Sequence, residues 1–156
     1  MKIRLATLND TASLTFLRQE RVVLLQQSDP RLTAPSDDFD TMLNDPNCRV
    51  VVGEIDDRIV GYAAGYIRQY LEHPLFPEVG LIAEMTLDAH KYYGGLGRAL
   101  FLELRNRLNQ TTISRMVVRV ARYHAVEQAF WRSLGASEDP EPIFEISPAL
   151  VWMRLT

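Results

Sequence analysis

The stretch AEMTLDAHKYYGGLGRAL, residues 83–100, is the most informative part of this chain. An apolar strand that ends near Leu87 continues through a short polar turn into glycines, and the glycines open directly into an amphipathic helix. The first backbone N–H groups of a helix have no intrahelical acceptor, and glycines leave room for a ligand to approach them. Together with the positive end of the helix dipole, these groups suit a phosphate. The stretch therefore predicts a phosphate-bearing ligand.

Spacing argues against two common phosphate loops. A Walker A loop ends in Gly-Lys-Ser/Thr, and this stretch lacks that ending. A dinucleotide fingerprint needs a third glycine where Leu100 stands, and it would usually open a Rossmann domain of this length rather than lie past mid-chain. For the motif alone, a glycine-rich turn without a ligand remains the alternative.

Further segments favour a ligand, because four of them, in order, resemble the GNAT N-acetyltransferase superfamily. In the family's cofactor loop, Gln/Arg-x-x-Gly-x-Gly/Ala, Tyr92 matches the first position, and Gly95 and Gly97 match the small ones. The other similar segments are residues 3–12 (opening strand and helix), 51–65 (second and third strands) and 118–136 (a strand, a polar residue and a short helix ending in an aromatic residue before Leu-Gly). The similarity covers nearly the whole chain.

Bulk properties are those of an ordinary globular domain. The chain has 156 residues, so we expect a single domain over residues 1–156. Its net charge of −3 gives no reason to expect nucleic acid as a partner. Cys48 is the only cysteine, so no internal disulfide can form. No apolar run follows residues 1–4 and no segment is long enough to span a bilayer, so we expect a cytoplasmic protein without a membrane partner.

Hydrophobic patterning predicts alternating strands and helices. The expected strands are residues 2–6, 49–55, 58–67, 79–87, 116–121 and 150–155, and the expected helices are residues 10–27, 36–44, 95–109 and 125–134. Asn9 or Asp10 would cap the first helix, and Asp56 and Asp57 would turn a hairpin. The segment 69–78, with Pro74 and Pro77, is expected to be a loop. The expected buried positions are Leu14, Leu17, Val22 and Leu25 in the first helix and Leu100, Phe101, Leu104 and Leu108 in the third.

With the resemblance, this order of elements implies an α+β, three-layer GNAT fold. Its sheet would be mixed but mostly antiparallel, with about six to seven strands and helices on both faces. The chemistry that the resemblance implies is acyl transfer to an amine, which needs a proton acceptor. An amine with a pKa near 10.4 is neutral in only about one molecule in 2,500 at pH 7, so its deprotonation costs roughly 4–5 kcal/mol.

Glu84 is the carboxylate that we expect to act as general base. It lies on the central strand shortly before the glycines, where many of the resembled enzymes carry an acid. Apolar Ile82, Ala83 and Met85 beside it favour burial, which disfavours the charged form of an acid. The alternative is an acid on the solvent side of the strand, or one paired with an arginine such as Arg119.

The resemblance also implies how the cosubstrate acetyl-CoA is held. The main chain of Met85, Thr86 and Leu87 would pair with the pantetheine arm, and an N–H near Leu87 would polarise the thioester oxygen. Lys91 and Arg98 would lie near the phosphates. The remaining expected contacts are Tyr92, Tyr93, Gly94, Gly95, Leu96, Gly97, Ala99, His124 and Trp131.

The second signature departs from the family. Trp131 stands where members often place the tyrosine that protonates the leaving thiolate, and an indole cannot do so. A thiol with a pKa of about 8.5 gains only roughly 2 kcal/mol from that proton at pH 7, so its loss would slow the enzyme without abolishing activity. Water or Tyr123 could substitute, with plain packing as the alternative role for Tyr123. His124 and Glu127 replace the family's asparagine and alanine.

Charge along the chain suggests a cationic acceptor, because acids dominate the two loops that usually line the acceptor side of this fold. In the first loop Asp29, Asp37, Asp38 and Asp40 outnumber Arg31, and in the second Glu138, Asp139, Glu141 and Glu145 stand unopposed. An anionic cofactor and a cationic amine entering from opposite sides would suit that field. The alternative is that these acids only aid solubility.

We therefore expect an N-acetyltransferase that moves the acetyl group of acetyl-CoA to a primary amine of a small molecule or peptide by direct attack on the thioester. A non-catalytic acyl-CoA-binding protein is one alternative, and a regulatory or interaction protein with the same fold is another. We expect no metal, since the histidines and the packed thiol of Cys48 lack ligand spacing. The last strand, with Trp152, could pair with a partner chain to form a homodimer.

Overall fold

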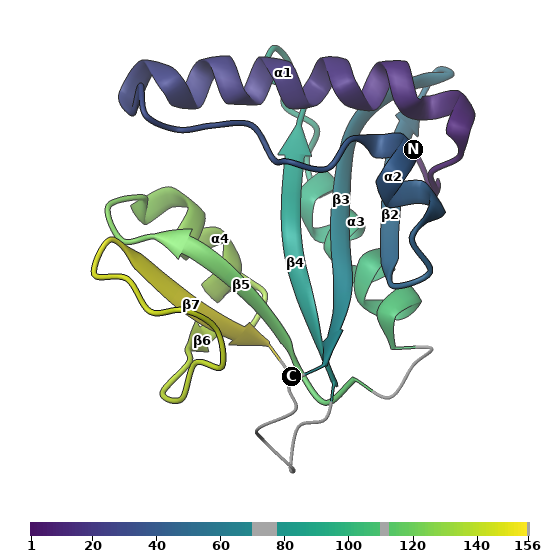
Figure 1. Ribbon diagram of the computed structural model, residues 1–156. Helices are drawn as coiled ribbons and strands as arrows, with labels where there is room; N and C mark the ends of the chain where they lie inside the picture. The colour runs from purple at the N-terminus through teal and green to yellow at the C-terminus, as the bar shows by residue number, and fades with distance from the viewer. Residues whose placement is uncertain (70–77, 110–112, 156) are drawn as a thin grey trace. The chain divides into compact units, whose positions relative to one another are not determined.

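The computed structural model describes residues 1–69, 78–109 and 113–155 (Figure 1). The elements are β1 (Lys2–Leu5), a 3-10 turn (Leu8–Asp10), α1 (Thr11–Ser28), α2 (Phe39–Asn44), β2 (Cys48–Ile55), β3 (Arg58–Gln69), β4 (Glu78–Leu87), α3 (Leu96–Leu108), β5 (Met116–Ala121), α4 (Ala125–Ser133), β6 (Ser137–Glu138) and β7 (Leu150–Leu155). All six predicted strands and all four predicted helices are present. Of the loop predicted for residues 69–78, Gln69 instead ends β3 and Glu78 begins β4, and residues 70–77 lie outside the described residues.

The seven strands form one mixed sheet in the order β1-β2-β3-β4-β5-β7-β6. β1 and β2 are antiparallel, as are β5 with β7 and β6 with β7. β4 and β5 are parallel, with Gly80–Ile82 of β4 in register with Met116–Val118 of β5. The predicted fold class is confirmed. The sequence pattern missed β6, which has only two residues and therefore shows no alternation.

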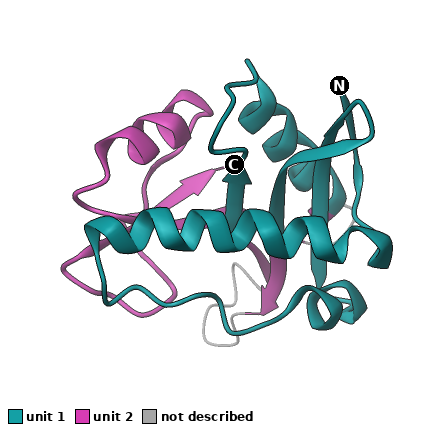
Figure 2. Cartoon of the chain, turned by 90° about the horizontal axis from the view of Figure 1, so that it is seen from above, with its two compact units in different colours: residues 1–64, 84–107 teal, residues 65–83, 108–156 magenta. Residues whose placement is uncertain are grey.

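The chain divides into two compact units (Figure 2). The first contains residues 1–64 and 84–107, and the second contains residues 65–83 and 108–156, so β3 and β4 each contribute to both. Within the described ranges, no helix has the length and apolar content needed to cross a membrane. The single-domain organisation stays a prediction.

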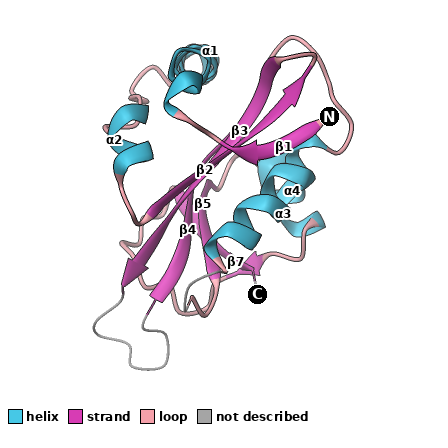
Figure 3. Cartoon of the chain, turned by 90° about the vertical axis from the view of Figure 1, so that its right-hand side faces the viewer, coloured by secondary structure: helices cyan, strands magenta, loops and turns pink. Residues whose placement is uncertain are grey.

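In the first unit, α1 and α2 lie on one side of the strands and α3 lies on the other (Figure 3). Leu14 and Leu17 of α1 are buried as predicted, whereas Val22 and Leu25 are only partly buried. The four apolar positions predicted for α3 are all at most 1% exposed. Beside Leu17, α1 also buries Arg18, which is 8% exposed. The apolar pattern gave no signal for this buried charge.

The start of α1 differs from the prediction. Asp10 is the residue before the helix, but its side chain makes no capping hydrogen bond to α1. Its carboxylate instead accepts from both terminal nitrogens of Arg4, at 2.8 and 3.0 Å, and from the N–H of Thr7 at 2.8 Å. The short 3-10 turn makes this possible, because it places Asp10 beside β1. Asp10 therefore fixes the connection between β1 and α1.

Two other turns follow from local chemistry. α2 begins at Phe39 rather than at Ser36, because the Asp38 carboxylate accepts from the N–H of Thr41 at 2.8 Å and caps the helix there. In the β2–β3 hairpin, Asp56 and Asp57 have φ values of 51° and 60°. Both lie in the left-handed region that a two-residue hairpin of this kind requires, so the predicted turn is confirmed.

Candidate active site

The loop between β4 and α3 leaves backbone N–H groups available at the start of the helix. Gly95 has a φ of +78°, a conformation that residues with a Cβ rarely adopt. The N–H of Leu96 donates to the Tyr93 carbonyl at 3.2 Å, and the N–H of Ala99 donates to the Gly95 carbonyl at 3.0 Å. Between them, the N–H groups of Gly97 and Arg98 have no backbone acceptor in the described part of the chain. A Cβ added at Gly95 would meet nothing within 4 Å, so this side of the loop is open.

Leu96 anchors the helix start against the strands. Its side chain is 1% exposed. A Cβ added at Gly53 of β2 would lie 2.6 Å from Leu96 Cδ1, and one added at Gly61 of β3 would lie 3.2 Å from Leu96 Cδ2. These two glycines therefore admit Leu96 and hold the start of α3 close to the sheet. Sequence reasoning assigned no role to Gly53 or Gly61, since the close approach is made only in the folded chain.

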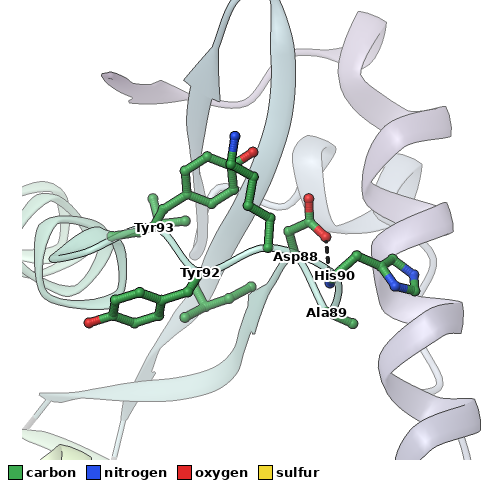
Figure 4. A pocket seen from close by; sticks show the side chains of 8 residues that line it. Asp88, Ala89, His90, Tyr92 and Tyr93 are labelled. Atoms are coloured by element: carbon green, nitrogen blue, oxygen red, sulfur yellow. Dashed lines mark hydrogen bonds between the residues drawn. The ribbon is translucent and has the colours of Figure 1, made fainter.

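The loop itself lines a cavity of about 270 Å³ (Figure 4). Asp88 accepts from the N–H of His90 at 2.9 Å, and the His90 ring lies 2.7 Å from a carboxylate oxygen of Glu20 on α1. Figure 4 shows His90 directed towards the helix, whereas Tyr92 and Tyr93 lie on the other side of the loop. The Tyr92 side chain is 88% exposed. His90 and Leu96 thus attach the loop to α1 and to the strands of the first unit, and the segment between them is open to a ligand.

Glu84 lies on β4, three positions before the end of that strand at Leu87, and is held by three hydrogen bonds. Arg18 Nε donates to Oε1 at 2.8 Å and Arg18 Nη2 donates to Oε2 at 2.7 Å. The Tyr62 hydroxyl of β3 donates to Oε1 at 2.9 Å. The charged side chains of Arg18 and Glu84 are 10% and 11% exposed. Glu84 therefore does not lie on a solvent face, and its arginine partner is Arg18 of α1 rather than Arg119.

The surroundings of Glu84 keep its two donors, Arg18 and Tyr62, protonated. Tyr62 is fully buried, and this burial, together with the charge of Glu84, raises the pKa of the Tyr62 phenol well above its ordinary value. Tyr62 is therefore protonated and acts as a donor. Burial lowers the pKa of Arg18, but the hydrogen bonds and charge of Glu84 outweigh it, so the pKa of Arg18 is raised. Thr86, 2% exposed, also hydrogen-bonds Tyr62 through its side chain.

The sequence profile of the family described as the acetyltransferase (GNAT) family matches residues 15–136. This chain belongs to the GNAT acetyltransferase family. The match spans most of the chain and includes Arg18, Glu84 and the whole β4–α3 loop. The resemblance drawn from the sequence is thus confirmed.

Solved structures share this GNAT fold at low sequence identity. A mutant of the BH1408 protein from Bacillus halodurans has a TM-score of 0.77 at 19% identity, covering 94% of this chain and 99% of that one. An acetyltransferase from Vibrio fischeri has a TM-score of 0.65 at 22% identity, covering 76% and 94%. An aminoglycoside acetyltransferase from an uncultured soil metagenomic sample, in complex with sisomicin, has a TM-score of 0.66 at 20% identity, covering 94% and 95%. No curated protein sequence matches the chain.

The residues expected from the second signature lie in the second unit, whereas Glu84 belongs to the first. His124 caps α4, because its Nδ1 accepts from the N–H of Glu127 at 3.1 Å. Trp131 is 1% exposed, and its ring packs against that of Phe130 with centroids 4.9 Å apart. Tyr123 is 67% exposed, so plain packing does not explain it. Of these residues, only Tyr123 presents a hydroxyl to solvent.

Several acids of the two presumed acceptor loops have structural partners. Asp38 caps α2, and Asp29 pairs with Arg31 at 3.5 Å. In the second unit, Glu138 pairs with Arg122 at 3.3 Å, and Asp139 forms a buried ion pair with Arg115 at 3.3 Å. The expectation that Glu138 and Asp139 stand unopposed is wrong, since cations distant in sequence reach them. These pairs weaken the charge argument for a cationic acceptor.

No cluster suited to a metal ion occurs within residues 1–69, 78–109 and 113–155. His90 hydrogen-bonds Glu20, and His124 caps α4. His73 lies outside the described residues. Cys48 is buried, as expected of a packed thiol.

Proposed function

We propose that this protein is an N-acetyltransferase that moves the acetyl group of acetyl-CoA to a primary amine of a small molecule or peptide. One observation carries the proposal: a buried carboxylate, Glu84, stands on β4 shortly before a glycine loop that opens α3, and both belong to the first unit. Membership of the GNAT family supports the acyl-transfer chemistry.

The loop fits the phosphates of coenzyme A. The N–H groups of Gly97 and Arg98 would hold them, and the open side of Gly95 leaves room for close approach. Lys91 and Arg98 are exposed cations on the same loop and helix start. The main chain of Met85, Thr86 and Leu87 would hold the pantetheine arm. Acetyl-CoA supplies the activated thioester when bound.

Acyl transfer to an amine releases one proton, and this chain offers Glu84 to accept it, directly or through one water. The carboxylate stands on a rigid strand and is held by two donors, so its oxygens occupy defined positions. At the leaving group, buried Trp131 offers no acid. Exposed Tyr123 or water would supply that proton, for which the driving force is only about 2 kcal/mol.

The acceptor belongs to the class of primary amines. Structural neighbours of this fold include an aminoglycoside acetyltransferase and a ribosomal-protein-alanine N-acetyltransferase from Brucella melitensis. One name indicates a small-molecule acceptor and the other a protein amine, so the fold is compatible with either class of acceptor. Because three acids of the presumed acceptor loops form ion pairs within the fold, charge gives little basis for choosing between the two classes of acceptor.

Two measurements test the proposal. Calorimetry with acetyl-CoA should show binding that Gly97→Glu abolishes, because a carboxylate at that position would crowd and repel the phosphates. Thiol release over a panel of small amines, aminoglycosides and peptides with free α- or side-chain amines should then identify a turned-over acceptor. Binding without turnover of any amine would favour a non-catalytic acyl-CoA-binding protein, and absence of binding would favour a regulatory or interaction role.

A further inference from the structure

Arg18 is a buried side chain of the first unit with several partners besides Glu84. Besides the two bonds to Glu84, Nη1 donates to the Asp37 carbonyl at 2.7 Å and Nη2 lies 3.1 Å from the Met42 sulfur. The guanidinium also stacks on the Phe39 ring, 3.9 Å from its centroid. Contacts from α2, the segment before it and β4 thus fix this one group. A guanidinium held in so many places cannot follow a moving carboxylate, so it sets where the carboxylate lies.

The hydrogen bonds from Arg18 and Tyr62 do not use every acceptor position of the Glu84 carboxylate. A carboxylate has about four lone-pair positions, two on each oxygen. Oε1 of Glu84 uses both, for Arg18 Nε and the Tyr62 hydroxyl, and Oε2 uses one, for Arg18 Nη2. With respect to the described residues 1–69, 78–109 and 113–155, a single acceptor position therefore remains, and it is on Oε2.

We propose that Arg18 and Tyr62 are positioning residues that leave Glu84 one open acceptor position, on Oε2, for the proton released by the acceptor amine. This inference rests on the proposed function. Arg18 sets the plane of the carboxylate through its fork, because two parallel N–H···O bonds fix both oxygens at once. Tyr62 occupies the second acceptor position of Oε1, so Oε1 cannot accept the amine proton or a hydrogen bond from water at that position. Phe39 supports both residues, lying under Arg18 and edge-on to the Tyr62 ring at 5.3 Å.

The test compares Arg18→Lys and Tyr62→Phe with Arg4→Lys. Arg4 is a matched control, because it also binds carboxylates in the first unit, those of Asp10 and Glu54, but does not touch Glu84. A lysine keeps the charge and loses the fork. Turnover, acetyl-CoA affinity, urea stability and the pH profile of kcat/KM are measured for each variant with the amine identified by the panel.

Arg18→Lys should lower kcat about 10–100-fold, as expected when a reacting group is displaced by a fraction of an ångström to an ångström, with acetyl-CoA affinity unchanged. Tyr62→Phe should lower kcat less, about 3–10-fold, because the fork stays in place. Both should shift the ascending limb of the pH profile, because each variant loses a hydrogen bond that the Glu84 carboxylate accepts in the wild type. In Arg18→Ala, added methylguanidinium should restore part of kcat. Arg4→Lys should lose stability only.

The outcomes separate this inference from the proposed function. If wild type is active and Arg18→Lys behaves like Arg4→Lys, with lower stability, an unchanged pH profile and no rescue of Arg18→Ala, the positioning role is overturned and the proposed function stands. If wild type turns over no amine, both fail together. Should Arg18→Lys not fold, the pH profile of Tyr62→Phe decides, because that variant removes one hydroxyl and leaves the ion pair intact; an unmoved limb then overturns the inference.

Discussion

Arg18 of α1 holds both carboxylate oxygens of Glu84 on β4, at 2.8 and 2.7 Å, across 66 positions of sequence. A buried pair of this kind gains from its two short charge-assisted bonds but has to offset the loss of hydration of both ions. Such a pair is therefore weak evidence for stability. Its position just before the proposed cofactor loop of a GNAT protein is what makes it relevant to function.

Glu84→Gln should lower turnover by about 10²–10⁴-fold, because it removes the proposed proton acceptor. It should also abolish the ascending limb of the pH profile and leave acetyl-CoA affinity unchanged. Since the change leaves the Arg18 charge buried without its counter-ion, we expect a loss of stability, of about 3–5 kcal/mol at most. Rates should therefore be compared at a temperature where urea titration shows both proteins folded. A variant as active as wild type at every pH would assign proton removal to water alone.

Gly95→Ala should weaken acetyl-CoA binding about tenfold, or about 1.4 kcal/mol, because a methyl group on the open side of the loop obstructs close approach of the phosphates. It should also destabilise the fold by about 1–2 kcal/mol through its left-handed φ of +78°. Gly135→Ala is the matched control: Gly135 has a φ of +97° and an equally open Cβ position. It should lose similar stability and keep the affinity measured by calorimetry. Equal affinities for the two variants would place the phosphates elsewhere.

Asp10 should contribute stability that depends on pH. Hydrogen bonds from Arg4 hold the pKa of Asp10 below its ordinary value of 3.8. An acid whose pKa is lower in the folded state stabilises the fold above its unfolded pKa and loses that effect as the pH falls through the folded pKa. Urea titrations should thus show Asp10→Asn to be less stable than wild type near pH 7, with a difference that shrinks below about pH 4. A difference independent of pH would show that packing, rather than the ion pair, is responsible.

Asp139→Asn should destabilise the protein, by about 3–5 kcal/mol at most, because it removes one charge of a buried ion pair with Arg115. The two side chains are only 5% and 1% exposed. Glu138→Gln should cost at most about 1 kcal/mol, since the Glu138 and Arg122 side chains are more than half exposed. Neither variant should change the salt dependence of kcat/KM. A selective loss of activity towards cationic amines in either one would restore a role for these acids in acceptor binding.

Local sequence was sufficient for the features that depend on neighbouring residues. The glycines before α3, the left-handed turn at Asp56 and Asp57 and the buried face of α3 all follow from chain geometry within a few positions, and the structure has them where they were predicted. The acid before the glycines was also predicted from its place on the strand. What it contacts was not, because the periodicity of α1 gives no indication of which strand residue a buried arginine will meet.

The sequence by itself thus determined the family, the order of the helices and of the six longer strands, and the glycine loop, because each of these depends on short patterns of apolar, polar and glycine residues. Only the tertiary structure decided which charges meet: Arg18 with Glu84, Arg4 with Asp10 and Arg115 with Asp139. Gly53 and Gly61 likewise acquire their role only when Leu96 packs on them. Ion pairs and close contacts depend on distances between residues far apart in the chain, and these distances exist only once the sheet has formed and the helices have packed on it.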